Sequence, residues 1–354
     1  MDNFLATAVV RWQAHSGRND LPWQNTRDPY RVWLSEIMLQ QTQVITVQAY
    51  FARFLDRFAD VQALAQAPLD DVLHLWAGLG YYSRARNLHR CAQDVVRLHG
   101  GKFPLSAYQL QTLPGIGRST AAAIAALCFG ERVAILDGNV KRVLTRYLGF
   151  ADDLALASSE RRLWDQATAL LPQDNLLHNM ARYTQGMMDL GATLCSTKKP
   201  ACRACPLAER CVAYSMNAVQ AFPVKTRKLK RSAESIWLLW LVSDDGAVWL
   251  SQRPTPGVWA GLYCLPLFQE RQALLAAVDQ QGAEALRDLP SFKHVLTHKD
   301  LYLHPVLLAV PGRPALALDG QWVDAAQLAR LGLPAPIKKL LKPCGSDHSR
   351  GDVL

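Results

Sequence analysis

The sequence of 354 residues has no hydrophobic run long enough to cross a membrane, which takes about 20 consecutive apolar residues. It also lacks the features of a secretory signal at its start. The opening residues, MDNFLATAVVRW, include an acid, have no basic leading segment and carry too short an apolar stretch. We therefore expect neither a membrane partner nor export, and predict a cytoplasmic protein.

Histidine is missing from the cluster formed by four of the eight cysteines, which follow the spacing C-x6-C-x2-C-x5-C. These four are Cys195, Cys202, Cys205 and Cys211. Four thiolates at this spacing suit either a tetrahedral zinc ion or an iron–sulfur cluster, and spacing alone does not separate the two. Disulfides are the weaker alternative, because a reducing compartment keeps thiols reduced.

The composition is neither low in complexity nor dominated by charge. Half of the residues are hydrophobic and 19% are charged, as in a folded globular protein, and the length is sufficient for two domains that each bury a core. The charge is unbalanced, because the chain contains 39 Lys and Arg but 30 Asp and Glu, which gives a net charge of +9. This excess favours a polyanionic partner such as nucleic acid.

The stretch Leu113–Val143 contains a glycine turn, an alanine-rich helix and an isolated carboxylate. Gly115 and Gly117 form the turn before the helix, so the free N–H groups of the helix start are expected to face a phosphate. Asp137 follows the apolar run VAIL and precedes a glycine and Asn139. This order predicts a nucleic-acid backbone held next to a reactive acid.

Glu36 is an acid within the apolar segment VWLSEIML. Asp28 and Pro29 are typical of a helix start, and the apolar spacing that follows predicts one continuous helix to about Phe58. In such surroundings the pKa of a carboxyl rises, which provides a general acid near neutral pH. The alternative is an exposed glutamate on the solvent side of an amphipathic helix.

Two further groups could meet DNA bases. Gln40 and Gln41 follow Glu36, and amides of this kind read base edges or fill the place of a displaced base. Tyr81 and Tyr82 lie at a glycine-marked helix break followed by arginines, a combination that suits insertion into a base stack. The alternatives are a polar helix surface for the glutamines and core packing for the tyrosines.

The composition changes after Phe222-Pro223, where the basic segment KTRKLKR is followed by strand-like runs around Asp245-Gly246. The sequence therefore predicts an all-α domain and a following α+β domain. Their predicted bounds are an all-α domain at 1–222, a basic linker at 223–233, an α+β domain at 234–342 and a disordered tail at 343–354.

Several motifs in this order resemble the endonuclease III family of helix–hairpin–helix DNA glycosylases, and within it the adenine-specific glycosylases. LPGIGRSTAAAI is similar to the family hairpin, at about residues 108–128, and LDGNVKRV carries the family aspartate. The cysteine spacing matches the 4Fe-4S loop of the family, here residues 195–211. LPWQ, VWLSEIMLQQTQV, GLGYYSRARNL and MMDLGA are similar to the adenine-specific branch.

The resemblance implies hydrolysis of the N-glycosidic bond of adenine mispaired with 8-oxoguanine or guanine in double-stranded DNA, by a DNA-associated monomer with one 4Fe-4S cluster. Glu36 would protonate the base, Asp137 would stabilise the sugar cation, and Asn139 would orient Asp137. The residues implied to meet the substrate or the displaced strand are Trp23, Leu39, Gln41, Tyr81, Gln185 and Met188.

Ser119 occupies the hairpin position where the strand-cleaving members of the family carry a lysine. The resemblance therefore implies a monofunctional enzyme that leaves an abasic site. Lys141, together with Gly115 and Gly117, is expected to contact the DNA backbone.

The second domain resembles the Nudix-like module that adenine glycosylases use to read the oxidised guanine. The segment LFQERQALLAAVDQQG lacks the R-E-x-x-E-E cluster of a working Nudix hydrolase, so hydrolysis by this domain is not expected. The lesion-reading Phe-Ser-His loop of the family corresponds here to Leu296, Thr297 and His298, which keeps the hydroxyl and the imidazole but loses the aromatic ring.

Two other functions compete with this prediction. One is a bifunctional glycosylase and lyase of the endonuclease III type, which Ser119 and the extra domain disfavour. The other is a non-catalytic iron–sulfur protein that binds DNA, which would have no need for both Glu36 and Asp137.

Overall fold

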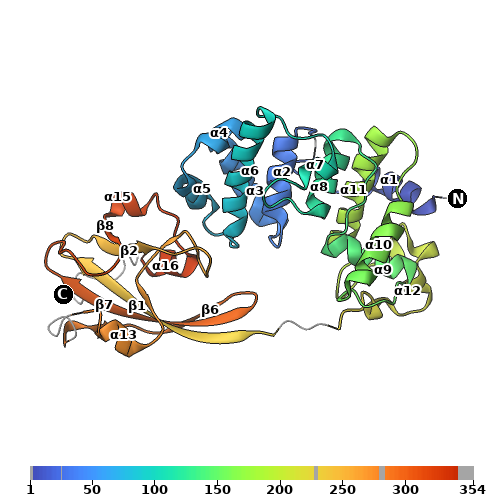
Figure 1. The fold of residues 1–354 in the computed structure, drawn as a ribbon. Helices are drawn as coiled ribbons and strands as arrows, with labels where there is room; N and C mark the ends of the chain where they lie inside the picture. The colour runs from blue at the N-terminus through green and yellow to red at the C-terminus, as the bar shows by residue number, and fades with distance from the viewer. Residues whose placement is uncertain (1–2, 25, 227–229, 279–283, 342–354) are drawn as a thin grey trace. The chain divides into compact units, whose positions relative to one another are not determined.

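The structure, a computed structural model, describes residues 3–24, 26–226, 230–278 and 284–341 (Figure 1). The chain forms two compact units, one from residues 1–66 and 87–228 and the other from residues 67–86 and 229–354. The first unit is helical and the second is built around a β-sheet, which confirms the predicted fold class. Among the described residues, no helix is both long and apolar enough to span a bilayer.

The helical unit consists of helices joined by short loops. Its longer helices are α1 (Phe4–Ser16), α2 (Pro29–Leu39), α3 (Val44–Arg57), α6 (Ser83–His99), α9 (Gly138–Leu148), α10 (Ala157–Ala169) and α11 (Leu176–Thr193). Its shorter ones are α4 (Val61–Gln66), α7 (Ala107–Leu110), α8 (Arg118–Ile124) and α12 (Val212–Ser215). The division between the two units falls inside α6.

The single helix predicted from Pro29 to about Phe58 is two helices, α2 and α3, so this prediction was wrong. The chain leaves the helical path at Gln41, whose φ of 58° lies in the left-handed region. A left-handed residue cannot continue a right-handed helix. Apolar residues on both sides of the break kept a helical spacing, which concealed the interruption from the sequence pattern.

A buried apolar core joins α1, α9, α10 and α11. Leu5 and Val9 of α1, Val140 of α9 and Met187 of α11 are each at most 1% exposed. Gly186 allows α1 to approach α11 closely, because a Cβ there would lie 2.7 Å from Val9 Cγ1. This core fixes α9 and α11, the two helices that carry the predicted site residues Asn139, Gln185 and Met188.

The second unit contains a sheet in which β1 (Ser232–Ser243) and β7 (Lys299–Val310) pair in parallel along their whole length. β1 also pairs antiparallel with β2 (Val248–Gln252), and this confirms the hairpin predicted around Asp245-Gly246. The remaining strands of the sheet are β3 (Tyr263–Cys264), β4 (Leu267–Phe268), β5 (Arg287–Asp288), β6 (Phe292–Val295) and β8 (Gln321–Val323).

Residues 67–86 belong to the sheet-containing unit although they precede most of the helical unit in the sequence. Their helix α5 (Leu69–Trp76) approaches Gly332, where an added Cβ would lie 3.0 Å from Leu73 Cβ. Tyr82 Oη donates to the Leu333 carbonyl at 3.3 Å. The other helices of this unit are α13 (Arg271–Leu275), α15 (Ala325–Leu328) and α16 (Ala335–Leu340).

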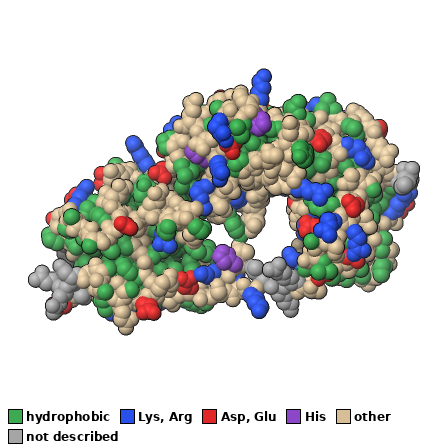
Figure 2. Space-filling model, in the orientation of Figure 1, with side chains coloured by type: hydrophobic (Ala, Val, Ile, Leu, Met, Phe, Trp, Pro, Cys, Tyr) green, Lys and Arg blue, Asp and Glu red, His purple; other side chains and the backbone are tan. Residues whose placement is uncertain are grey.

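Lys and Arg side chains are spread over the face of the molecule shown in Figure 2, with Asp and Glu side chains among them. The positive net charge is therefore not gathered into one stripe on this face. The predicted tail, 343–354, and residues 227–229 of the predicted linker lie outside the described residues.

Candidate active site

Glu36 lies on α2, where the Asp28 side chain caps the helix by accepting from the Tyr30 N–H at 3.0 Å. Its neighbours in the chain, Ser35 and Ile37, are buried. Burial, and then the negative charge of Asp137, raise the pKa of Glu36 to about 7. The predicted rise in this pKa is thereby confirmed, and the carboxyl can hold a proton at neutral pH.

Asp137 is the N-cap of α9, and its Oδ1 accepts from the Val140 N–H at 2.7 Å. Burial raises the pKa of Asp137. Hydrogen bonds from the N–H groups of Val140 and Asn139 and the charges of Arg142 and Lys141 offset part of that rise. These donors hold a negative charge in place at the start of the helix, where the helix dipole also favours it.

Glu36 and Asp137 line one cavity of about 840 Å³. This cavity, which we call the front cavity, brings together residues predicted from distant parts of the sequence. The other predicted residues that line it are Trp23, Leu39, Gln41, Ser119, Asn139, Gln185 and Met188. A buried acid, a capped carboxylate and a concave wall between them form an arrangement suited to protonating one atom of a substrate beside a developing positive charge.

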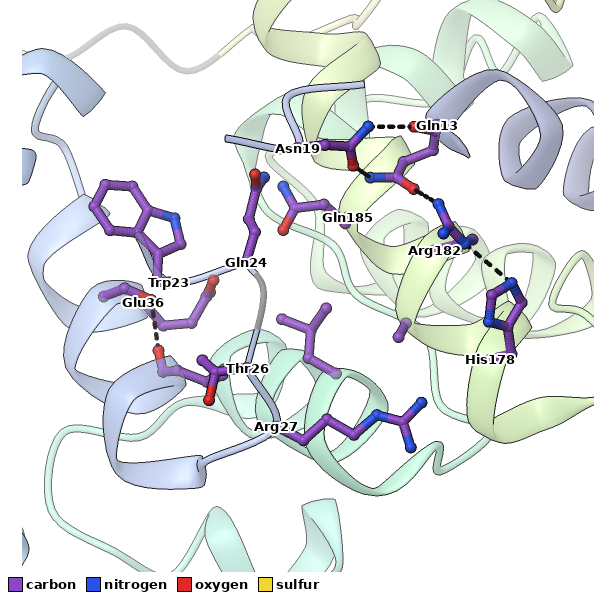
Figure 3. Close-up of a pocket in the computed structure, with 14 residues that line it drawn as sticks. Gln13, Asn19, Trp23, Gln24, Thr26, Arg27, Glu36, His178, Arg182 and Gln185 are labelled. Atoms are coloured by element: carbon purple, nitrogen blue, oxygen red, sulfur yellow. Dashed lines mark hydrogen bonds between the residues drawn. The ribbon is translucent and has the colours of Figure 1, made fainter. Parts of the chain in front are cut away.

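A second cavity of about 310 Å³, which we call the rear cavity, shares Trp23, Glu36 and Gln185 with the front cavity (Figure 3). A hydrogen-bonded chain lines its other side. Gln13 Nε2 donates to Asn19 Oδ1 at 2.7 Å, and Arg182 Nη1 donates to Gln13 Oε1 at 2.9 Å. Glu36 is therefore bordered by open space on two sides.

Two charged residues of the front cavity, Arg18 and Arg142, were not predicted as site residues. Arg18 forms an ion pair with Asp189 on α11, with 2.7 Å between Arg18 Nη2 and Asp189 Oδ1. Arg142 Nη2 donates to Asn139 Oδ1 at 2.8 Å, and Arg142 Nε donates to the Cys195 carbonyl at 2.8 Å. The sequence contained a signal for Arg142 alone, because it lies one helical turn after the predicted Asn139.

Ser119 lies near the start of α8 and its Oγ accepts from the Leu136 N–H at 3.1 Å. This bond ties the hairpin to the segment that leads into Asp137. Lys141, the predicted backbone contact, is ion-paired with Glu160 at 2.6 Å. Gly115 has a φ of 76°, and a Cβ there would lie 2.7 Å from Asn87 Cβ, so the turn requires glycine for both reasons.

The four clustered cysteines line one cavity of about 30 Å³ together with Arg146 of α9. Arg146 is buried, and its Nη1 donates to Cys195 Sγ at 3.3 Å. Burial, and then the neighbouring cysteines, raise the pKa of Cys205 to about 11 despite a backbone hydrogen bond that lowers it. In the described part of the chain, no three His, Cys, Asp or Glu side chains are gathered as ligands of a single ion.

Tyr81, Thr297 and His298 do not belong to the front cavity. They line a cavity of about 640 Å³ within the sheet-containing unit. The Tyr81 hydroxyl is hydrogen-bonded to Thr297 Oγ1, and Tyr81 is 42% exposed, so core packing is the wrong interpretation for this residue. The same cavity includes Trp259 and His294, which the sequence patterns did not indicate.

Comparison with known proteins gives two family matches. Residues 34–166 match the HhH-GPD superfamily base excision DNA repair protein model, and residues 237–343 match the NUDIX domain model. An adenine DNA glycosylase of Homo sapiens is 42% identical, covering 95% of this chain and 73% of the relative. One of Buchnera aphidicola is 35% identical, covering 94% of this chain and 95% of the relative. The chain belongs to the adenine DNA glycosylase family.

Solved structures support the same fold for the helical unit of this family member. A thermostable thymine-DNA glycosylase is 28% identical with a TM-score of 0.53, covering 60% of this chain and 95% of that one. An endonuclease III–DNA complex has a TM-score of 0.50 at 20% identity, covering 60% and 94% of the two chains, and shows the fold alone. The protein is therefore a DNA glycosylase with a Nudix-like second domain, as the sequence predicted.

Proposed function

We propose that this chain hydrolyses the N-glycosidic bond of adenine mispaired with 8-oxoguanine or guanine in duplex DNA. The observation that carries the proposal is the pair of acids in the front cavity, Glu36 with a pKa raised to about 7 and the capped Asp137. A pKa near the working pH leaves a large fraction of Glu36 protonated and keeps the carboxyl acidic enough to donate its proton. The adenine-specific relatives support adenine as the base.

Glu36 supplies the proton that makes adenine a leaving group. The proton passes from the carboxyl to N7 of the base, and the C1′–N9 bond breaks with its electron pair going to adenine. The sugar is left as an oxocarbenium-like cation, which the Asp137 carboxylate stabilises from within the cavity. Water then adds to C1′ and loses a proton to the Glu36 carboxylate, which restores the acid.

The adenine must leave the base stack to reach these acids. Trp23, Leu39, Gln185 and Met188 line the front cavity and would enclose the flipped base. Gln41 also lines it, at the left-handed turn between α2 and α3, and would fill the gap that the base leaves.

The product is an abasic site in an uncut strand. Strand cleavage by a lyase requires an amine that forms a Schiff base with the sugar. Ser119 places a hydroxyl at the hairpin position, and that hydroxyl accepts from the Leu136 N–H. The nearest candidate on α9, Lys141, is engaged with Glu160.

The cavity of about 640 Å³ in the sheet-containing unit would read the base opposite adenine. Thr297 and His298 would contact 8-oxoguanine through a hydroxyl and an imidazole, and Tyr81 both holds Thr297 and offers an exposed ring for stacking. Leu296 replaces the aromatic residue of the family loop but still lines the cavity, so it keeps an apolar contact.

The four cysteines would hold one 4Fe-4S cluster. They border a common cavity with Arg146, and four thiolates at this spacing suit such a cluster. When bound, the cluster supplies covalent cross-links for the loop at 195–211. The proposed partner is double-stranded DNA, and the proposed active form is a DNA-associated monomer in the cytoplasm.

A single-turnover assay on a duplex with adenine opposite 8-oxoguanine tests the function. Base loss that becomes a strand break only after alkali supports the proposal, whereas a break without alkali would indicate a lyase. Tight binding without base loss would indicate a non-catalytic protein. Glu36→Gln should retain DNA binding and lose base excision, and retained excision would disprove the role of Glu36 as the acid. Glu270→Gln, at an exposed site outside the cavities, is the matched control and should leave the rate unchanged.

A further inference from the structure

Gln185 is one of the amides that line the front cavity, and its orientation is fixed by Asp189, which is not among the lining residues. Gln185 and Asp189 lie four residues apart on α11 and so share one face of the helix. Gln185 Nε2 donates to Asp189 Oδ1 at 3.0 Å. Figure 3 shows the Gln185 side chain extending from its helix toward the rear cavity, where it lies near Gln24.

Asp189 can act only as an acceptor in this arrangement. Its side chain is 0% exposed, and its Oδ1 accepts from Arg18 Nε at 2.7 Å while its Oδ2 accepts from the Arg18 N–H at 3.1 Å. Burial raises the pKa of Asp189, but the charge of Arg18 and the hydrogen bonds from Arg18 and Gln185 offset part of that rise and favour the carboxylate. A carboxylate cannot donate, so the amide of Gln185 must turn its NH2 group toward Asp189.

The opposite end of the amide is then also determined. Oε1 of Gln185 points away from Asp189, and in the described part of the chain no donor is bonded to it. The cavities that Gln185 lines are those that also contain Glu36. The amide thus presents a fixed acceptor to any base that Glu36 can reach.

We propose that Asp189, held by Arg18, is a positioning residue that fixes the Gln185 amide with its oxygen toward the base, and so selects a 6-amino purine over a 6-oxo purine. Adenine carries an N6–H donor at this position, whereas guanine and hypoxanthine carry an O6 acceptor. The inference rests on the proposed function and adds the origin of its base selectivity. An acceptor facing O6 would leave both oxygens unpaired in a closed site.

The test compares single-turnover excision of adenine and of hypoxanthine, each placed opposite 8-oxoguanine, by the full chain. The asparagine of the Asp189→Asn variant can donate as well as accept. The Gln185 amide can then rotate so that its Oε1 and Nε2 exchange places. We expect the adenine-to-hypoxanthine rate ratio to fall about 10-fold or more relative to the unaltered chain, with hypoxanthine excision rising in absolute rate. A merely structural role would slow both bases equally, and an unchanged ratio would overturn the proposal.

A double-mutant cycle assigns the effect to Gln185. Gln185→Ala should lower the ratio by itself, and adding Asp189→Asn should then change the ratio by less than about 2-fold. A full additional effect of Asp189→Asn in that background would overturn the proposal, because Asp189 would then act through another group.

Two controls keep the result interpretable. Asp189→Asn leaves Arg18 without its counter-charge, so the charge-balanced Arg18→Gln/Asp189→Asn chain is measured as well and should show the same fall in the ratio. A normal ratio in that variant would contradict the proposal. The unaltered chain separates the two hypotheses. If it fails to excise adenine, the proposed function is wrong. If it excises adenine but the substitutions leave the adenine-to-hypoxanthine ratio unchanged, only the role of Asp189 is refuted.

Discussion

Glu36 illustrates how one residue trades stability for chemistry. The burial that raises its pKa to about 7 does so by disfavouring the carboxylate, and the nearby charge of Asp137 acts in the same direction. In the unfolded chain the carboxyl has its ordinary pKa of 4.5. The folded state therefore binds the Glu36 proton more tightly than the unfolded state does.

Replacing Glu36 by Gln should stabilise the protein in a pH-dependent way. The pKa of Glu36 is higher in the folded state than in the unfolded state. The loss in free energy of unfolding caused by burying its carboxylate is therefore absent below the unfolded pKa, grows as pH rises and is complete above the folded pKa. We expect little change in the free energy of unfolding below about pH 4.5, and a gain of up to about 3 kcal/mol near pH 8. Chemical unfolding at both pH values, with exposed Glu270→Gln as control, measures this difference. A gain that is equal at the two pH values would contradict the explanation.

The sequence predicted those residues of the front cavity that contrast with their neighbours in the chain. Glu36 within an apolar helix and Asp137 after an apolar run are both visible as departures from their surroundings. The pair of Arg18 and Asp189 was missed because the two residues lie 171 positions apart, and neither stands out until the fold buries them together. Local patterns show which residues are unusual, but pairing across the fold depends on tertiary packing.

The helix α9 is the element on which several parts of the site depend. Asp137 caps its start, Arg142 joins Asn139 to the Cys195 carbonyl, and Arg146 reaches Cys195 Sγ. Arg146 also donates to the Ser196 carbonyl at 2.7 Å and therefore ties the cysteine loop to the helix at several points. The loop at 195–211 and the start of α9 are thus parts of one hydrogen-bonded assembly.

Arg146→Lys should loosen this assembly although it keeps the charge. Lysine has no planar fork of donors, so several of the buried carbonyls that Arg146 satisfies would lose their partner. We expect the free energy of unfolding to fall by about 2–4 kcal/mol and proteolysis within the loop at 195–211 to accelerate. Arg162→Lys, at an exposed ion pair with Asp152, is the matched control and should have little effect. Equal effects of the two substitutions would contradict the role assigned to Arg146.

At the scale of elements, the break between α2 and α3 marks the limit of sequence patterns. Periodicity reports which side of a helix is buried, and apolar residues such as Met38 and Val47 satisfied it on both sides of the break. The left-handed conformation of Gln41 is a property of a single residue that leaves no trace in that periodicity.

At the scale of the whole chain, the sheet-containing unit draws on two distant segments. The Tyr81 hydroxyl and Thr297 Oγ1 are hydrogen-bonded although 216 positions separate them. Composition located the change from helical to strand-rich sequence near residue 222, but it could not indicate that residues 67–86 pack with the later part of the chain. Packing of this kind is decided by contacts between segments and not by the properties of either segment alone.

Tyr81→Phe and Thr297→Val each remove one partner of this hydrogen bond, and we expect both to reduce the preference for adenine opposite 8-oxoguanine over adenine opposite guanine. Each single variant should lower the ratio of the two excision rates by about 5-fold, as expected for one lost hydrogen bond. The double variant should lose little more than either single one, because the residues act through one bond. Additive losses would show that the two side chains contact the lesion independently. Tyr108→Phe, at an exposed tyrosine of α7, is the control.

The sheet-containing unit is formed from two segments that are distant in the sequence, so its folding depends on the order in which the chain is synthesised. Leu73 emerges from the ribosome long before Gly261 and Gly332, which lie close to it in the finished protein. At synthesis rates of about 5–20 residues per second, this interval lasts roughly ten seconds to a minute. During that time the helical unit can close around its own core while α5 still lacks its later partners. Completion of the sheet-containing unit is therefore tied to the end of synthesis. A ribosome that stalls late would release a chain with Glu36 and Asp137 in place but Tyr81 without Thr297.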